Sequence, residues 1–280
     1  MGHAANETRC GKRGQEMFLR SVAYPWMRAS MARRMFVEGL DELIAMAPAR
    51  GVLLVSNHRS FFDLYAIMLA IWMGPVGWAR QLYFPVRANF FYDRLLGVLV
   101  NFIVGGGVMY PPVFRQRERA QRNRDALQLM QSFLQQPNSL LGMHPEGTRG
   151  KGDDPYQLLP AQPGVGEIAL TAKPVIIPVF INGLSNNFFG EIRRNYARGV
   201  RRENPLICVF GKPLDCDELF AMTPRLALYK VASDRFRLEI MALGEREKRL
   251  RAACLAAEIG DDHPGWLDNR GRGLFYASPR

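Results

Sequence analysis

The sequence predicts an α/β fold in which a mixed, largely parallel β-sheet is flanked by helices and follows an amphipathic helical segment. From residue 51 onward, short apolar runs rich in β-branched residues alternate with longer helical patterns. Before residue 38, large apolar residues recur at helical spacing among arginines. We therefore predict three regions: a basic amphipathic helical region over 1–45, a core with the functional site over 46–215, and a helical extension with a tail over 216–280.

The N-terminal pattern predicts a helix over residues 14–37, kinked at Pro25 because proline removes a backbone donor. Its apolar stripe and its arginines are Met17, Phe18, Val22, Trp26, Met27, Met31, Met35 and Phe36, with Arg20, Arg28, Arg33 and Arg34. Such a helix can lie in a membrane interface, apolar face down and arginines among the phosphates, so we predict a membrane-binding segment. The same pattern also fits a surface helix packed on the core.

The later elements follow from the alternating patterns. Strand-like runs occupy residues 52–56, 82–87, 102–110, 139–144, 174–182 and 206–212. Helical patterns occupy residues 63–73, 90–100, 117–136 and 217–258. Strands separated by helices favour parallel pairing, because a crossover helix returns the chain to the same end of the sheet.

The charge of the chain favours an anionic partner. Its 37 Lys and Arg against 26 Asp and Glu give a formal net charge of +11, which suits lipid headgroups, nucleic acid or a phosphorylated small molecule. We do not expect nucleic acid, because no binding motif is present and the aromatic residues fall in apolar runs instead of among the arginines. The scattered cysteines and histidines lack the spacing of a zinc site, so we predict no metal.

The distribution of apolar residues predicts a cytoplasmic location at a membrane surface. The first sixteen residues are polar and contain no apolar stretch of a secretory signal. Two uncharged runs, over residues 64–79 and 95–114, are interrupted by glycine and proline, whereas a spanning helix needs roughly 20 unbroken apolar residues. We therefore expect peripheral or monotopic attachment to the cytoplasmic face of the cell membrane.

His58 and Asp63 form the first candidate site. A buried strand ends near Asn57 and a helix begins near Ser60, so Asp63 would lie in the first helical turn. Side chains of a first turn lean toward the N-terminus, which would point Asp63 at His58. A carboxylate on one ring nitrogen fixes the tautomer and leaves the other nitrogen as a general base. Alternatively, Ser60 and Asp63 form only a capping box.

The second candidate site follows another apolar run. Gly147 permits a tight turn with positive φ, after which Arg149 can grip a phosphate with paired donors. Glu146 would accept from a substrate hydroxyl or hold Arg149 in place. A plain polar turn with a surface ion pair fits the same residues. We expect His144 to be structural, because the role of base already has a better candidate.

These motifs together resemble those of the PlsC-like glycerolipid acyltransferases, which include 1-acylglycerol-3-phosphate acyltransferases. Residues 57–63 look like the family's N-H-x-x-x-x-D motif, and residues 145–149 like its P-E-G-T-R motif. Residues 174–179 resemble its proline-containing strand, and residues 210–214 its G-K-P-L segment. Two departures stand out. His144 replaces the usual phenylalanine, and residues 107–112 lack the arginine of the second motif, for which Arg115 or Arg117 would substitute.

The resemblance implies an O-acyltransferase whose catalytic core spans residues 46–215. His58 would deprotonate the hydroxyl of a lysophospholipid, such as 1-acylglycerol-3-phosphate, which would then attack the thioester of acyl-CoA or acyl carrier protein. Asp63 would orient His58, and no covalent acyl-enzyme and no cofactor would be needed. The substrate-binding residues implied are Glu146, Gly147, Thr148, Arg149 and Arg115. The alternatives are another lysophospholipid or lipid-like alcohol as acceptor, or a catalytically silent lipid-binding protein on the same scaffold.

Overall fold

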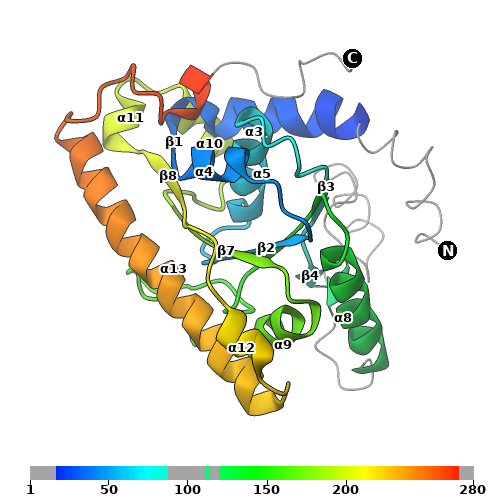
Figure 1. Ribbon diagram of the computed structural model, residues 1–280. Helices are drawn as coiled ribbons and strands as arrows, with labels where there is room; N and C mark the ends of the chain where they lie inside the picture. The colour runs from blue at the N-terminus through cyan, green and yellow to red at the C-terminus, as the bar shows by residue number, and fades with distance from the viewer. Residues whose placement is uncertain (1–16, 88–110, 114–119, 271–280) are drawn as a thin grey trace.

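The computed structural model describes residues 17–87, 111–113 and 120–270, which form a central sheet covered by helices (Figure 1). The strands of this sheet, in spatial order, are β1 (Met35–Glu38), β8 (Leu206–Phe210), β7 (Val175–Asn182), β2 (Val52–Ser56), β6 (Ser139–Met143) and β3 (Gln81–Tyr83). Neighbouring strands pair in parallel except β7 with β8, which are antiparallel. The predicted mixed, largely parallel α/β sheet is therefore confirmed.

Strand β2 at the centre of the sheet shows why both faces are covered. All five of its residues are buried, and successive side chains of a strand point to opposite faces. Val52 and Leu54 belong to the core beside helix α5 (Asp63–Met73). Leu53 and Val55 belong to the opposite core, beside α9 (Pro163–Ala172) and the long α13 (Leu226–Leu255). A continuous apolar strand requires this arrangement of two helical layers.

Helix α5 has the predicted bounds, and all of its residues are buried. The apolar run that begins at Leu64 is therefore core over the whole helix. No helix in the described part of the chain is both long enough and apolar enough to cross a membrane.

The predicted N-terminal helix is wrong at its C-terminal end. The chain forms a π-helical turn (Leu19–Ala23), α3 (Tyr24–Met31) and a 3₁₀ turn (Ala32–Arg34), and then enters β1. Three consecutive buried apolar residues, Met35 to Val37, pair with β8 instead of continuing the helix. The π turn ends just before Pro25, which lies in the first turn of α3, where its missing donor costs little.

The apolar stripe of this segment mostly faces the core. Tyr24, Met27 and Met31 are buried, and Tyr24 packs against Trp72 of α5 with ring centroids 6.5 Å apart. Helix α3 therefore packs on the core, as the alternative interpretation expects, and membrane binding by this segment stays a prediction. Met17, which precedes it, is 68% exposed.

The remaining predictions are confirmed, corrected or outside the described residues. The run over 82–87 is divided between β3 and β4 (Val86–Arg87), which pairs with β5 (Pro112–Val113) in a second small sheet. The pattern over 217–258 forms two helices, α12 (Asp217–Ala221) and α13. Helix α8 (Ala120–Leu134) lies within its predicted range, whereas the predictions over 90–100 and 102–110 fall outside the described residues.

The other described elements are short and connect these layers. They are α4 (Leu40–Ala45), α10 (Phe188–Asn195), α11 (Val200–Glu203) and the 3₁₀ turn η4 (Leu267–Arg270).

Close packing of α9 on α13 gives a stability prediction. A Cβ added at Gly166 would lie 2.0 Å from the backbone oxygen of Tyr229, whereas one at Gly164 in the same helix would meet nothing within 4 Å. We expect Gly166→Ala to lower the free energy of unfolding by about 1–3 kcal/mol, the usual range for overpacking. Gly164→Ala should raise it by up to about 1 kcal/mol through helix propensity. Equal urea midpoints for the two variants would contradict this helix contact.

Candidate functional site

Parallel pairing brings the two predicted motifs to one edge of the sheet. Strand β2 pairs in parallel with β6 on one side and with β7 on the other. The segments that follow these three strands therefore meet at their carboxyl ends, where ligands bind in open α/β sheets. They are residues 57–63, residues 144–150 and residues 183–187, which we call the β7 loop. The first two contain the predicted motifs, whereas the β7 loop was not singled out from the sequence.

His58 and Asp63 are in direct contact. His58 Nδ1 lies 3.1 Å from Asp63 Oδ2, and the same oxygen accepts from the backbone amides of Arg59 at 2.7 Å and Ser60 at 2.8 Å. One carboxylate oxygen therefore both holds the backbone at the start of α5 and contacts the His58 ring, as the two interpretations of this motif each require, and the catalytic role of the contact stays a prediction. With Asp63 ionised, the proton of the His58 ring is held on Nδ1, which makes Nε2 the basic nitrogen.

Burial changes the electrostatics of Asp63. The residue is 1% exposed, and desolvation raises its pKa to about 6, although the hydrogen bonds from the backbone amides of Ser60 and Arg59 favour the charged form. A pKa near 6 leaves Asp63 mostly ionised at neutral pH.

His144 lies closer to His58 than the sequence indicates. The two imidazole rings are stacked, with centroids 3.9 Å apart and an interplanar angle of 2°. His144 Nδ1 lies 3.1 Å from the backbone oxygen of Ser56 and 3.0 Å from its hydroxyl. Desolvation, reinforced by repulsion from His58, lowers the pKa of His144 to about 3. A neutral ring therefore forms one wall against His58 and restricts its orientation.

Glu146 binds the backbone of the first motif. Its Oε1 accepts from the amide of His58 at 2.8 Å, and its Oε2 accepts from the amide of Leu159 at 2.8 Å. The side chain is buried, and this desolvation raises its pKa. The hydrogen bonds of this carboxylate thus go to backbone amides and not to Arg149, which the sequence had offered as its partner. Glu146 therefore fixes the position of the His58 backbone amide.

The turn that follows has the predicted conformation. Gly147 has φ +62°, and its amide donates to the backbone oxygen of His144 at 3.0 Å. Thr148 is half-buried and Arg149 is exposed. The guanidinium of Arg149 donates to Asn186 Oδ1 at 2.9 Å, which connects it to the β7 loop.

Asn57 is a site residue whose role became clear only in the structure. Its side-chain amide donates to the backbone oxygen of Ile181 and accepts from the amide of the same residue, each at 2.8 Å. This buried side chain continues the pairing of β2 with β7 beyond the last residue of β2. Its position in the motif directly before His58 was the available sequence signal.

Arg115 lies outside the described residues. Among the described residues, no group of His, Cys, Asp and Glu side chains is suited to hold a metal ion.

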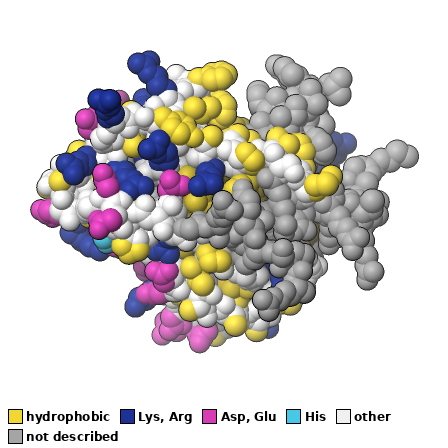
Figure 2. Space-filling view, turned by 90° about the horizontal axis from the view of Figure 1, so that it is seen from above, with side chains coloured by type: hydrophobic (Ala, Val, Ile, Leu, Met, Phe, Trp, Pro, Cys, Tyr) yellow, Lys and Arg dark blue, Asp and Glu magenta, His cyan; other side chains and the backbone are white. Residues whose placement is uncertain are grey.

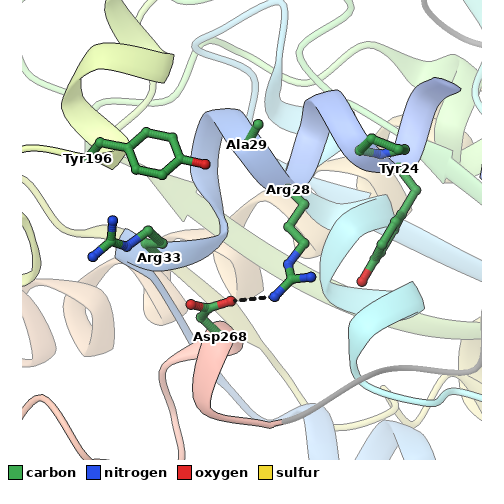
Figure 3. A pocket seen from close by; sticks show the side chains of 7 residues that line it. Tyr24, Arg28, Ala29, Arg33, Tyr196 and Asp268 are labelled. Atoms are coloured by element: carbon green, nitrogen blue, oxygen red, sulfur yellow. Dashed lines mark hydrogen bonds and ion pairs between the residues drawn. The ribbon is translucent and has the colours of Figure 1, made fainter. Parts of the chain in front are cut away.

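One cavity among the described residues contains none of the predicted site residues. It has a volume of about 320 Å³ and lies between α3, the end of α10 and η4. Figure 3 shows Arg28 pointing to Asp268 across it, with a nitrogen–oxygen distance of 3.1 Å, and Arg33 on the side of Tyr196. The candidate site is instead the contact between His58 and Asp63, because a base with an orienting carboxylate is what indicates a catalytic site.

Comparison with known proteins gives the family of the chain. Residues 34–182 match the family model described as Acyltransferase. No curated protein matches the chain significantly in sequence. The crystal structure of the 1-acyl-sn-glycerophosphate (LPA) acyltransferase PlsC from Thermotoga maritima is similar with a TM-score of 0.43 and 17% sequence identity, over 86% of each chain. Because the family model covers more than half of the chain, from β1 to the end of β7, the protein belongs to the acyltransferase family.

Proposed function

We propose that the protein transfers a fatty acyl group from acyl-CoA or acyl carrier protein to the hydroxyl of a lysophospholipid, with 1-acylglycerol-3-phosphate as acceptor and phosphatidate as product. The observation that carries the proposal is the 3.1 Å contact between His58 Nδ1 and Asp63 Oδ2, at an edge of the sheet that also presents Arg149. Membership of the acyltransferase family supports the reaction type. The acceptor is inferred from the cationic group beside the base.

The proposed chemistry needs one general base and no covalent intermediate. His58 Nε2 takes the proton of the acceptor hydroxyl while the hydroxyl oxygen attacks the thioester carbonyl carbon. The carbon–sulfur bond then breaks, and the imidazolium returns the proton to the leaving thiolate. Asp63 stabilises the imidazolium, which is the charge that develops during the attack. The buried cysteines do not offer a competing nucleophile, since desolvation raises the pKa of Cys208, Cys216 and Cys254.

Arg149 is the proposed phosphate ligand. It is exposed and lies in the motif beside His58 and Asp63. A guanidinium suits a phosphate because its donors form a planar fork. Gly147 and Thr148 shape the turn that presents it, and we retain Arg115 as a further proposed contact. Holding the phosphate would place the acceptor hydroxyl at His58, and such positioning supplies a large part of enzymatic rate enhancement.

We further propose that the protein binds an anionic membrane surface on the cytoplasmic side, through the face that contains α3 and α10. Figure 2 shows apolar side chains beside Lys and Arg on the face seen from above. Phe189 of α10 is 80% exposed, and Arg193 one helical turn later is also exposed. The next residue inward, Phe188, packs on Phe62 and Trp26 with centroids 6.0 and 5.6 Å apart. This apolar surface therefore reaches the His58 motif, where a lipid acceptor would arrive.

Substitution of His58 and of Asp63 tests the chemistry. His58→Ala should lower kcat by roughly 10²–10⁴-fold, because it removes the general base. Asp63→Asn should lower kcat strongly with a smaller change in KM, because the neutral amide cannot stabilise the imidazolium. The assay follows acyl transfer from acyl-CoA or acyl carrier protein to a panel of lysolipids. The exposed His263 gives a matched control, since His263→Ala should retain activity. Undiminished transfer by His58→Ala would refute the proposed role.

The raised pKa of Asp63 predicts an acid limb in the pH profile. The active form has Asp63 ionised, so kcat/KM should fall as the pH drops through about 6. The neutral His144, whose pKa is lowered to about 3, does not titrate in this range. Initial rates between pH 4.5 and pH 8 in buffers of constant ionic strength measure the limb. Constant kcat/KM down to pH 5 would contradict the electrostatic environment described for Asp63.

The membrane face can be tested without disturbing the core. Phe189→Asp should weaken sedimentation with vesicles containing phosphatidylglycerol by roughly tenfold or more, since a large exposed apolar side chain is lost from the interface. Leu238→Asp on α13 is the matched control, because Leu238 is 60% exposed on another helix. Equal sedimentation of both variants and the unsubstituted protein would exclude this face as the point of attachment.

A further inference from the structure

One side chain of the β7 loop joins the two motifs. Asn186 Oδ1 accepts from the backbone amide of Phe61 at 2.8 Å and from Arg149 Nη1 at 2.9 Å. The hydroxyl of Ser60 lies 3.5 Å from the same oxygen. A single amide oxygen therefore contacts both the turn that presents His58 and the guanidinium of the proposed phosphate site.

We propose that Asn186 is a positioning residue that sets the distance between the acceptor's phosphate and the base. This inference rests on the proposed function, because it assigns Asn186 to the acceptor site. The reacting hydroxyl and the phosphate belong to one small molecule, so Arg149 and His58 must be held in a defined relation to each other. Asn186 supplies that relation through two hydrogen bonds to different motifs.

A buried ion pair fixes the β7 loop from its buried side. Arg34, at the end of the N-terminal helical segment, pairs with Glu191 of α10, and both side chains are buried. Arg34 Nη1 also donates to the backbone oxygens of Gly183 at 3.1 Å and Asn204 at 2.9 Å. Glu191 Oε1 accepts from the Ser185 amide at 3.0 Å and its hydroxyl at 2.6 Å. The residue before Asn186 is thus fixed by a buried charge.

The β7 loop is also tied directly to the first motif. The hydroxyl of Ser60 donates to the backbone oxygen of Ser185 at 2.8 Å and accepts from the amide of Phe62 at 3.1 Å. The loop therefore has fixed contacts on both sides of the site. Asn186 itself is exposed, so its side chain lies at the surface of a braced loop, where it can contact Arg149 without being part of the core.

The chemical nature of the residue is informative. A neutral amide oxygen orients a guanidinium without cancelling its charge, whereas a carboxylate would form an ion pair with it. An asparagine at this position therefore keeps the positive charge of Arg149 available to an anionic acceptor. An aspartate would retain the acceptor oxygen but compete with the phosphate.

Two substitutions at this position separate the consequences. Asn186→Ala removes both hydrogen bonds and should raise KM for 1-acylglycerol-3-phosphate roughly tenfold and lower kcat severalfold. Asn186→Asp preserves an oxygen for the Phe61 amide but neutralises Arg149. It should raise KM at least as much as Asn186→Ala while kcat stays within about twofold of the unsubstituted protein. A merely structural role would change both variants in the same way.

The neighbouring asparagine gives a matched control. Asn187 is also exposed, and its side chain accepts from the amide of Gly190 at 3.0 Å as the N-cap of α10. Asn187→Ala should lower the melting temperature through loss of the cap while leaving KM unchanged. If Asn186→Ala and Asn187→Ala give the same KM as the unsubstituted protein, the positioning role is wrong.

A binding measurement distinguishes failure of this inference from failure of the proposed function. Titration of 1-acylglycerol-3-phosphate below its critical micelle concentration, without any thioester, reports on the acceptor site alone. Affinity weakened roughly tenfold in both Asn186 variants, but not in Asn187→Ala, supports the inference even if no acyl transfer is detected. Affinity unchanged in both Asn186 variants overturns it even if the unsubstituted protein transfers acyl groups.

Discussion

The parallel alignment of β6, β2 and β7 is the constraint on which the site depends. Because these three strands run in the same direction, the segments after them meet at one edge of the sheet. Asn57 extends the alignment past the end of β2, because its side-chain amide bonds both the backbone oxygen and the backbone amide of Ile181. His58 therefore starts from a backbone whose position is set by β7 as well as by its own strand.

Buried carboxylates hold the geometry of this edge. Asp63 accepts from two backbone amides and the His58 ring, Glu146 from the amides of His58 and Leu159, and Glu191 from the amide of Ser185. Burying a charge is costly unless its hydrogen bonds are made, and here they are made mostly to the main chain. Each such hydrogen bond restricts the backbone conformation of a loop at this edge. The site is thus organised before any substrate arrives, which is the condition for effective electrostatic catalysis.

The two imidazoles have unequal environments. Desolvation and the proximity of His58 lower the pKa of His144 to about 3, so this ring remains uncharged through the range in which Asp63, with its pKa near 6, titrates. The two stacked rings, His58 and His144, therefore have different hydrogen-bond partners. His58 is connected to the carboxylate, and His144 is anchored to Ser56 at the end of β2. A neutral second ring packs against the proposed base without adding a competing proton acceptor of similar strength.

Local patterns determined the elements and the pairing of His58 with Asp63. Strand β2 and helix α5 could be predicted because their signals are short-range. The strand is a continuous apolar run, and the helix begins at a capping pattern that apolar residues follow. The five-residue spacing at a helix start also suffices to bring Asp63 to the His58 ring, because no distant part of the chain is needed. The first acyltransferase-like motif, residues 57–63, runs from the end of this strand to the first residue of this helix.

The tertiary structure alone decided the fate of residues whose partners are far away in sequence. Met35 to Val37 carry a helical pattern, but the open edge of β8 makes them a strand. Arg34 resembles a surface cation, yet Glu191, 157 positions later, allows it to be buried. The contact of Asn186 with Arg149 likewise has no local signature, because it arises only when β7 lies beside β2. Hydrogen bonds and buried charges between distant segments depend on the fold, whereas periodicity and capping depend only on neighbours along the chain.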